Sequence, residues 1–241
     1  MIDYLIKSGL CLTLLIIFYH LVLEKEKMNR FNRFYLLGSI VFSFLVPNFI
    51  ITIAPTAQET PVFSEINTIQ EPMTFTQMSQ ENIVEAIDYT PYLVGLYILV
   101  SSILLLILSK NIYEILTKVK RNKNINYFSA TVVLLKERIA PYSFLQYIFI
   151  NKHSYQTDSL EQQILTHELA HVEQKHSIDV LFIEIMQKLF WFNPIFRFYK
   201  KAIQLNHEFL ADDAVIYSHK NIAEYQQVLV NTTAQHNNIY L

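Results

Sequence analysis

The string His167-Glu168-Leu169-Ala170-His171 combines two imidazoles and a carboxylate at a spacing that suits metal chemistry. Residues four apart project from the same face of an α-helix, so both imidazoles can bind one metal ion while Glu168 lies beside the water bound to it. Zinc takes such mixed nitrogen and oxygen ligands, and catalytic zinc sites leave the fourth position to water. Because zinc lowers the pKa of that water, Glu168 could accept its proton as it attacks a carbonyl carbon.

A second string with histidine and acidic residues lies downstream and could supply the third ligand. Within residues 207–212, Glu208 and Asp212 share one helical face. Glu208 is the expected third ligand, and Asp212 is expected to accept a hydrogen bond from the far ring nitrogen of a zinc-bound histidine. A structural interpretation without metal binding stays open at each string. In the first string the histidines would face solvent, and in the second the acids would only make a helix surface polar.

Composition narrows the kind of site and of partner. The single cysteine, Cys11, has no mate, so neither a disulfide framework nor a thiolate metal site can be built. With a net charge of −2 and no basic stripe, the chain is not expected to bind nucleic acid directly. Hydrophobic residues make up 52% of the sequence, which favours lipid as a second solvent.

Helical signals surround both strings. Asp158 and Glu161 form a capping box that predicts a helix through the 160s. Ser177 is a candidate cap of a second helix, whose apolar residues between 178 and 192 fall at helical spacing. Several charged residues make lipid immersion of that stretch costly, so we expect it to pack on protein or to lie at the interface. Asn193 and Pro194 predict the start of a third helix, which would carry the second string.

Short apolar runs at residues 130–135 and 145–150 predict strands of a small hairpin or a piece of sheet. The run at 145–150 could present an edge to an extended substrate, although such a strand is more often core.

Three stretches are long and apolar enough to cross a bilayer, which needs roughly 20 helical residues. They are residues 2–23, 34–53 and 89–109, within a membrane region that spans residues 1–110. The first contains Asp3, Lys7 and His20, and a signal peptide is the alternative interpretation there.

Loop charge predicts the orientation of these spans. Lys and Arg gather in the loop after the first span and in the segment after the third, whereas residues 54–88 contain neither and hold several acids. Since short cytoplasmic loops are rich in Lys and Arg, we expect residues 54–88 and the amino terminus to be external and residues 111–241 to be cytoplasmic.

The strings HELAH, HSIDVLFIE, WFNP and HEFLADDAV, placed after three spans, resemble the membrane metallopeptidases typified by the beta-lactam sensor-transducers BlaR and MecR. The resemblance implies that His167, His171 and Glu208 bind zinc and that Glu168 is the catalytic base. It also implies a cytoplasmic gluzincin-like domain that cuts itself or a transcriptional repressor when an external signal arrives. Prenyl-protein and heat-shock membrane proteases share the HExxH and ExxxD pattern, which argues for the same chemistry on other substrates.

Those sensor-transducers continue into a fourth span and an external penicillin-binding domain, and the sequence up to Leu241 contains neither. We therefore expect either a fragment that lacks the carboxy-terminal sensor region or a member that senses a different signal.

Together, these patterns predict a mainly α-helical membrane protein, with three transmembrane helices followed by a cytoplasmic α+β zinc metallopeptidase domain that contains a small β element. The expected partners are a protein substrate and the lipid bilayer; nothing in the sequence indicates an oligomeric state. Two rival functions stay open: a non-enzymatic receptor or scaffold with a structural metal, and a housekeeping protease for misfolded membrane proteins.

His176 and Asp179 could support the site. Candidate donors to the oxyanion are Tyr142, His153, Tyr199 and His207.

Overall fold

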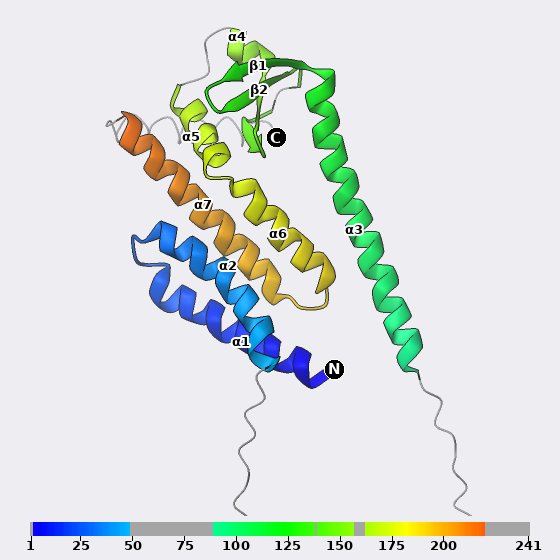
Figure 1. The fold of residues 1–241 in the computed structure, drawn as a ribbon. Coiled ribbons are helices and arrows are strands. Elements are labelled where there is room, and N and C mark those ends of the chain that lie inside the picture. Colours follow the sequence, from blue (N-terminus) through cyan, green and yellow to red (C-terminus); the bar gives the residue numbers. More distant parts are fainter. Residues whose placement is uncertain (1, 49–88, 138, 157–161, 220–241) are drawn as a thin grey trace, which may run out of the picture.

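The computed structural model describes residues 2–48, 89–137, 139–156 and 162–219, and over these residues the chain is mainly helical with one small sheet (Figure 1). The helices are α1 (Ile2–Phe18), extended by the π-helical turn η1 (Tyr19–Leu23); α2 (Asn29–Leu45), followed by the 3₁₀ turn η2 (Val46–Asn48); α3 (Thr90–Arg121); α4 (Lys152–Gln156); α5 (Gln162–Glu173); α6 (His176–Leu189); and α7 (Ile195–His219). The strands are β1 (Lys123–Tyr127), β2 (Ala130–Leu135), β3 (Tyr142–Phe144) and β4 (Tyr147–Asn151).

Among the described residues, two helical segments are long and apolar enough to cross a membrane, Asp3–Leu23 and Thr90–Arg121. They correspond to the first and third expected spans. The expected second span at 34–53 is wrong as a spanning helix, because the 17 residues of α2 end at Leu45. At about 1.5 Å per residue they reach only about 25 Å, short of a hydrocarbon layer about 30 Å thick. Pro47 explains the ending, since proline has no N–H to donate to the carbonyl four residues before it. Residues 49–53 and the expected external loop at 54–88 lie outside the described part.

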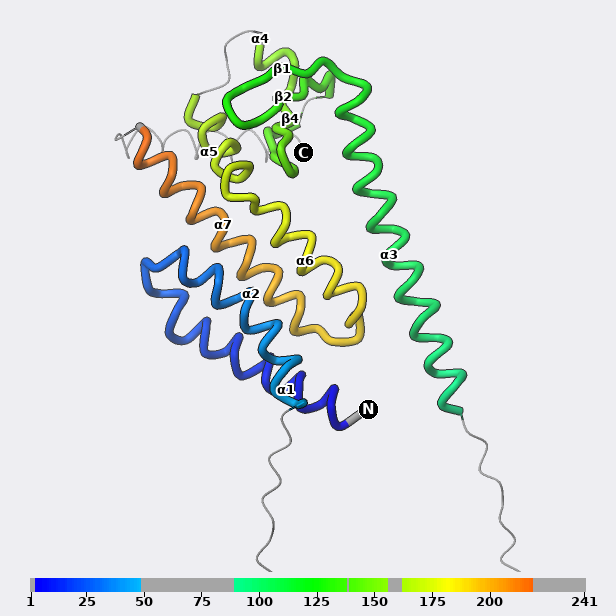
Figure 2. Tube along the Cα trace, in the orientation of Figure 1, coloured from blue at the N-terminus to red at the C-terminus, as the bar shows by residue number. Residues whose placement is uncertain are grey.

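Helices α1, α2, α6 and α7 share one apolar core (Figure 2). The fully buried side chains include Leu12, Leu36, Ile183 and Phe196, one from each helix. Tyr199 also lies there, with its hydroxyl 3.0 Å from that of Ser39 and 3.3 Å from the carbonyl of Leu12, to which it donates. The amino-terminal helices thereby form a platform against which α7 is fixed.

The sheet has the strand order β1-β2-β4-β3. Both expected apolar runs are strands. Of the two expected arrangements, the piece of sheet is confirmed and the hairpin is wrong, because β2 and β4 pair in parallel while β1 and β3 pair antiparallel on the outside. The side chains of β2 and β4 alternate between the two faces of the sheet, and both faces are buried. One face packs against α5 and the other against the carboxy-terminal end of α3. The sheet therefore links the helix that carries HELAH to a membrane-spanning helix.

Helices α5, α6 and α7 follow one another closely, as the sequence predicted, although one cap differs. Lys175 takes a left-handed conformation with a φ of 55° and turns the chain from α5 into α6. The expectation that Ser177 caps α6 is wrong, because its hydroxyl instead accepts a hydrogen bond from the backbone of Leu145 at 2.8 Å. The expected start of α7 is confirmed: the Asn193 side chain accepts from the backbone of Ile195 at 3.0 Å. The capping box at 158 and 161 falls outside the described residues.

Candidate metal centre

The side chains of His167, His171 and Glu208 meet at the crossing of α5 and α7. One ligand atom of each lies within 4.8 Å of the others. The two Nε2 atoms of His167 and His171 are 3.1 Å apart, and the Glu208 oxygens lie 3.4 Å from His167 Nε2 and 3.8 Å from His171 Nε2. A tetrahedral zinc ion with bonds of about 2 Å requires ligand atoms about 3.3 Å apart. The donor set and its spacing therefore fit such an ion.

Each of the two imidazoles also has a partner on its outer nitrogen. His167 Nδ1 lies 3.1 Å from Asp212 Oδ1, one turn beyond Glu208 on α7. His171 Nδ1 lies 2.8 Å from His176 Nδ1 at the start of α6. Such partners hold a histidine in one tautomer and one ring orientation. The structure thus places Asp212 where the sequence predicted it and gives His176 the corresponding position at the second imidazole.

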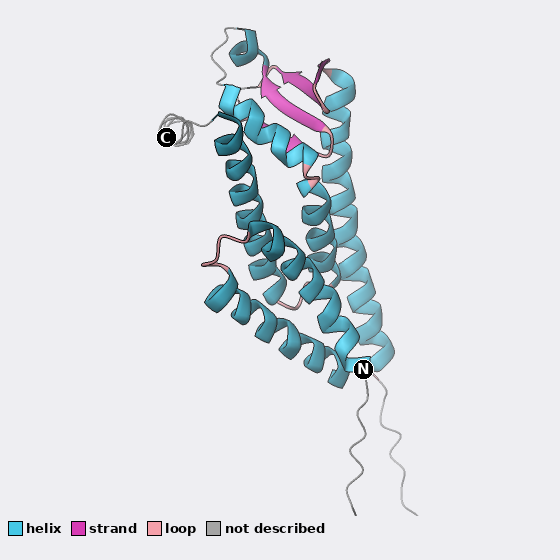
Figure 3. Cartoon of the chain, turned by 60° about the vertical axis from the view of Figure 1, so that its left-hand side comes forward, coloured by secondary structure: helices cyan, strands magenta, loops and turns pink. Residues whose placement is uncertain are grey.

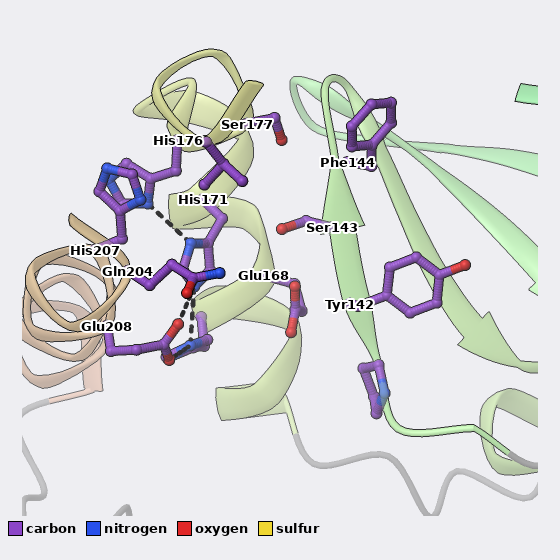
Figure 4. A pocket seen from close by; sticks show the side chains of 13 residues that line it. Tyr142, Ser143, Phe144, Glu168, His171, His176, Ser177, Gln204, His207 and Glu208 are labelled. Atoms are coloured by element: carbon purple, nitrogen blue, oxygen red, sulfur yellow. Dashed lines mark hydrogen bonds and ion pairs between the residues drawn. The ribbon is translucent and has the colours of Figure 1, made fainter. Parts of the chain in front are cut away.

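Glu168 points the other way, toward β3 (Figure 4). Its side chain is 8% exposed, and burial raises the pKa of its carboxyl, although the charge of His167 and a hydrogen bond from Ser143 oppose the shift. Helical spacing accounts for this placement, because Glu168 follows His167 by one residue and is therefore rotated by about 100° from it. Sequence reasoning missed Ser143, since its only signal was proximity along the chain to Tyr142.

The three candidate ligands differ in pKa. Burial disfavours the charged form of His167, but hydrogen bonds to Asp212 and Glu208 outweigh it and raise the pKa of His167 to about 9. Burial, together with the charge on His167, lowers the pKa of His171 to about 4. The hydrogen bond with His167 holds the pKa of Glu208 below its usual value. One positive and one negative charge therefore face each other at neutral pH, with His171 neutral.

A buried ionic network lies behind the centre. Asp179 of α6 receives hydrogen bonds from Arg33 of α2 at 2.6 Å and from His207 of α7 at 2.9 Å. Burial opposes ionisation of Asp179, but these two donors lower the pKa of its carboxyl below the usual value. The His207 ring stacks on His176 with centroids 4.0 Å apart. The contribution of Arg33 was not foreseen, because it comes from a helix far away in the sequence.

A cavity of about 510 Å³ opens onto these residues, lined by β3 on one side and by α5, α6 and α7 on the other (Figure 4). Of the four candidate oxyanion donors, Tyr142 and His207 line it. Tyr199 lies instead in the helical core, and His153 belongs to α4, outside the lining. His207 is already bonded to Asp179, and the Tyr142 ring stacks on Phe149 with its hydroxyl directed away from Glu168 (Figure 4), so none of the four has a free donor beside the candidate metal ligands.

The strand at the cavity is not the one considered from the sequence, whose more common interpretation as a core strand is confirmed. The run at 145–150 forms most of β4, which is paired on both sides and cannot add another strand. The sheet edge next to the cavity is β3, whose Tyr142, Ser143 and Phe144 all line it. Sequence reasoning missed this strand because three residues carry too little periodicity to register.

Comparison with protein families matches residues 8–240 to a family described as BlaR1 peptidase M56. The match covers nearly the whole chain, including most of the first apolar helix, the whole of the second and all the residues of the candidate centre. A search of curated proteins found no match.

Proposed function

The chain belongs to the BlaR1 peptidase M56 family, and from this premise we propose that it is a membrane-anchored zinc endopeptidase whose metal is held by His167, His171 and Glu208. Membership makes it a membrane-associated peptidase. The observation that supports the finer proposal is the convergence of two imidazoles and one carboxylate beside the buried Glu168.

The residues divide the chemistry among themselves. Zinc, when bound, supplies a Lewis acid and a water molecule of lowered pKa. Glu168 is the general base, and its burial-raised pKa brings its proton affinity closer to neutrality, where a base works best. Asp212 and His176 keep the two imidazoles oriented with their Nε2 atoms toward Glu208.

The proposed substrate is an extended polypeptide that adds to the free edge of β3. Main-chain hydrogen bonds along such an edge hold a substrate regardless of its side chains, and β3 lies directly across the cavity from Glu168. We propose that the natural substrate is a cytoplasmic regulatory protein or the chain itself, cut in response to an external signal. The regulatory substrate and the external signal rest on membership of the family. The cytoplasmic location rests on the charge of the loops, and it requires the chain to cross the bilayer between residues 33 and 54 although α2 alone is too short to span it.

The experiment is to compare purified chains with single substitutions for zinc content and for cleavage of an unfolded test protein and of the chain itself. Glu168→Gln should keep stoichiometric zinc and lose cleavage by about 100-fold or more, because the general base is gone. Glu173→Gln, an exposed glutamate on the same helix, is the matched control and should cleave normally. Full activity of Glu168→Gln would refute the mechanism, and zinc without any cleavage in the unmodified chain would favour a receptor with a structural metal.

Orientation is tested separately. A reporter fused after residue 70 should behave as external and one fused after residue 125 as cytoplasmic; the opposite result would overturn the proposed location of the site.

A further inference from the structure

The α6–α7 hairpin, residues 176–219, reaches from the metal centre to the apolar part of the molecule. Its tip, residues 190–194, packs between the end of α2 and the first part of α3. The Phe190 ring lies 4.8 Å from Phe44 of α2, and the Tyr97 hydroxyl of α3 donates to the carbonyl of Leu189 at 2.9 Å. The Phe192 ring also meets Tyr97, with centroids 6.3 Å apart.

These contacts fix the depth of the tip relative to a helix that can span a bilayer. Tyr97 lies seven residues into Thr90–Arg121, so it is about 10 Å along the helix axis from the helix start. Helix α6 then runs alongside α3 in the opposite direction (Figures 1 and 3). Its 14 residues extend about 21 Å, so its other end lies near Lys110, the first charged residue of α3. The hairpin therefore lies beside the apolar section of α3.

Apolar side chains form exposed stripes along both helices of the hairpin. On α6 and the tip, Ile178, Ile185 and Phe192 follow at intervals of seven and are 54%, 40% and 47% exposed. On α7, Phe198, Leu205 and Phe209 share one face and are 58%, 38% and 41% exposed. Soluble proteins rarely expose contiguous apolar surface of this extent. Because these stripes adjoin a helix built to contact lipid, acyl chains are the occupant that fits them.

The charged residues of the hairpin do not oppose this placement. Glu184 accepts from Lys200 at 2.5 Å and lies 3.5 Å from Lys188, so these charges are paired across the two helices. Asp179 is paired with Arg33 and His207. Arg197 and Lys201 are exposed and do not line the cavity, but they lie on a strip of α7 beside its apolar stripe, from which their long side chains can extend toward a polar interface. Charges at membrane depth are tolerated when they pair with one another or line a polar cavity.

We propose that the α6–α7 hairpin is inserted in the bilayer, with its tip in the acyl-chain layer beside α3 and its apolar stripes covered by lipid. The metal centre then lies at the boundary of the membrane, and the sequence-based objection to lipid immersion of residues 178–192 is answered by internal pairing of its charges.

Trp191, at the tip, is the one tryptophan of the chain and is 43% exposed, so its fluorescence reports on the tip without any substitution. The full chain is reconstituted in vesicles of phosphatidylcholine brominated in the middle of the acyl chains. Bromine quenches only what it touches, so Trp191 should lose roughly half of its emission or more in these vesicles, because the hydrocarbon layer surrounds it. Aqueous iodide should quench it little.

A matched control moves the probe out of the proposed layer. Tyr217→Trp in a Trp191→Phe background places a tryptophan near the far end of α7, where the side chain is 87% exposed. This probe should be quenched by iodide and not by bromine, whereas Phe198→Trp in the same background should behave like Trp191. The proposal is overturned if Trp191 and the Phe198→Trp probe are quenched by iodide as strongly as the Tyr217→Trp probe and ignore bromine. None of these readouts requires proteolysis, so the outcome is independent of the proposed activity.

Discussion

Zinc binding should release close to one proton per ion at neutral pH, and His167 should be its source. A histidine binds a metal through a free lone pair, so a protonated ligand must lose its proton first. In the metal-free centre the pKa of His167 is raised to about 9, whereas His171, with a pKa of about 4, is already neutral. The carboxyl of Glu208, whose pKa is lowered, is already ionised. Only His167 therefore has a proton to give up.

The size of the effect follows from the distance between the pH and this pKa. At pH 7 only about one His167 in a hundred is neutral, so the apparent affinity for zinc should be about 100-fold below its limit. Because the pKa is raised, the affinity should rise with pH, by about tenfold per unit, until it levels off near pH 9. Between pH 6.5 and pH 8 the gain should be roughly 30-fold.

Two measurements on the purified metal-free chain test this reasoning. Calorimetric titration with zinc at pH 7 in two buffers of different ionisation enthalpy counts the protons released, and competition with a chelator gives the affinity at each pH. Asp212→Asn is the matched control: it removes the charge that holds the proton on His167, so both the proton count and the pH slope should fall. An affinity that does not change with pH, with no proton released by the unmodified chain, would refute the assignment of His167 as the charged member of the centre.

Three further substitutions have outcomes that differ in kind. Glu208→Ala should reduce zinc affinity by about 100-fold or more, measured by chelator competition, because it removes the ligand that comes from α7. His176→Leu should reduce it by about 10- to 100-fold while circular dichroism stays unchanged, because His176 only orients His171. Arg33→Met should destabilise the fold by about 3 kcal/mol, measured by thermal or denaturant unfolding, because it leaves the buried Asp179 carboxylate without its cation. The control is Arg30→Met, at an exposed position on the same helix, which should have little effect on the free energy of unfolding.

The local part of the centre could be predicted because it depends on helical periodicity alone. His167 and His171 share a face at any i, i+4 spacing, and Glu208 with Asp212 repeats that geometry on another helix. That the two helices cross at these residues is not a local property, yet it was predictable from chemistry: two imidazoles and a carboxylate complete a zinc ligand set. The structure brings one ligand atom of each of those side chains within 4.8 Å of the others.

The parts that could not be predicted depend on contacts between distant segments. Nothing in the strings around Asp179 indicates Arg33, because their pairing requires α2 to pack along α7. The parallel pairing of β2 with β4 was missed because it depends on β3. The chain between β2 and β4 forms this third strand, which pairs with the outer edge of β4. Hydropathy alone also overextended α2, since it does not register the effect of Pro47 on the helix.

The two helices of the hairpin give the molecule a direct mechanical connection between its ends. At one end, α6 supplies His176 and α7 supplies Glu208 and Asp212, so the geometry of the centre depends on how these two helices sit against α5. At the other end, their tip contacts Phe44 and Tyr97, close to where α2 ends and α3 begins. Glu184 with Lys200 and Asp179 with His207 tie the two helices together along their length. Because the two helices are tied together, we expect a displacement of α2 or α3 at the tip to be passed along the hairpin toward Glu208.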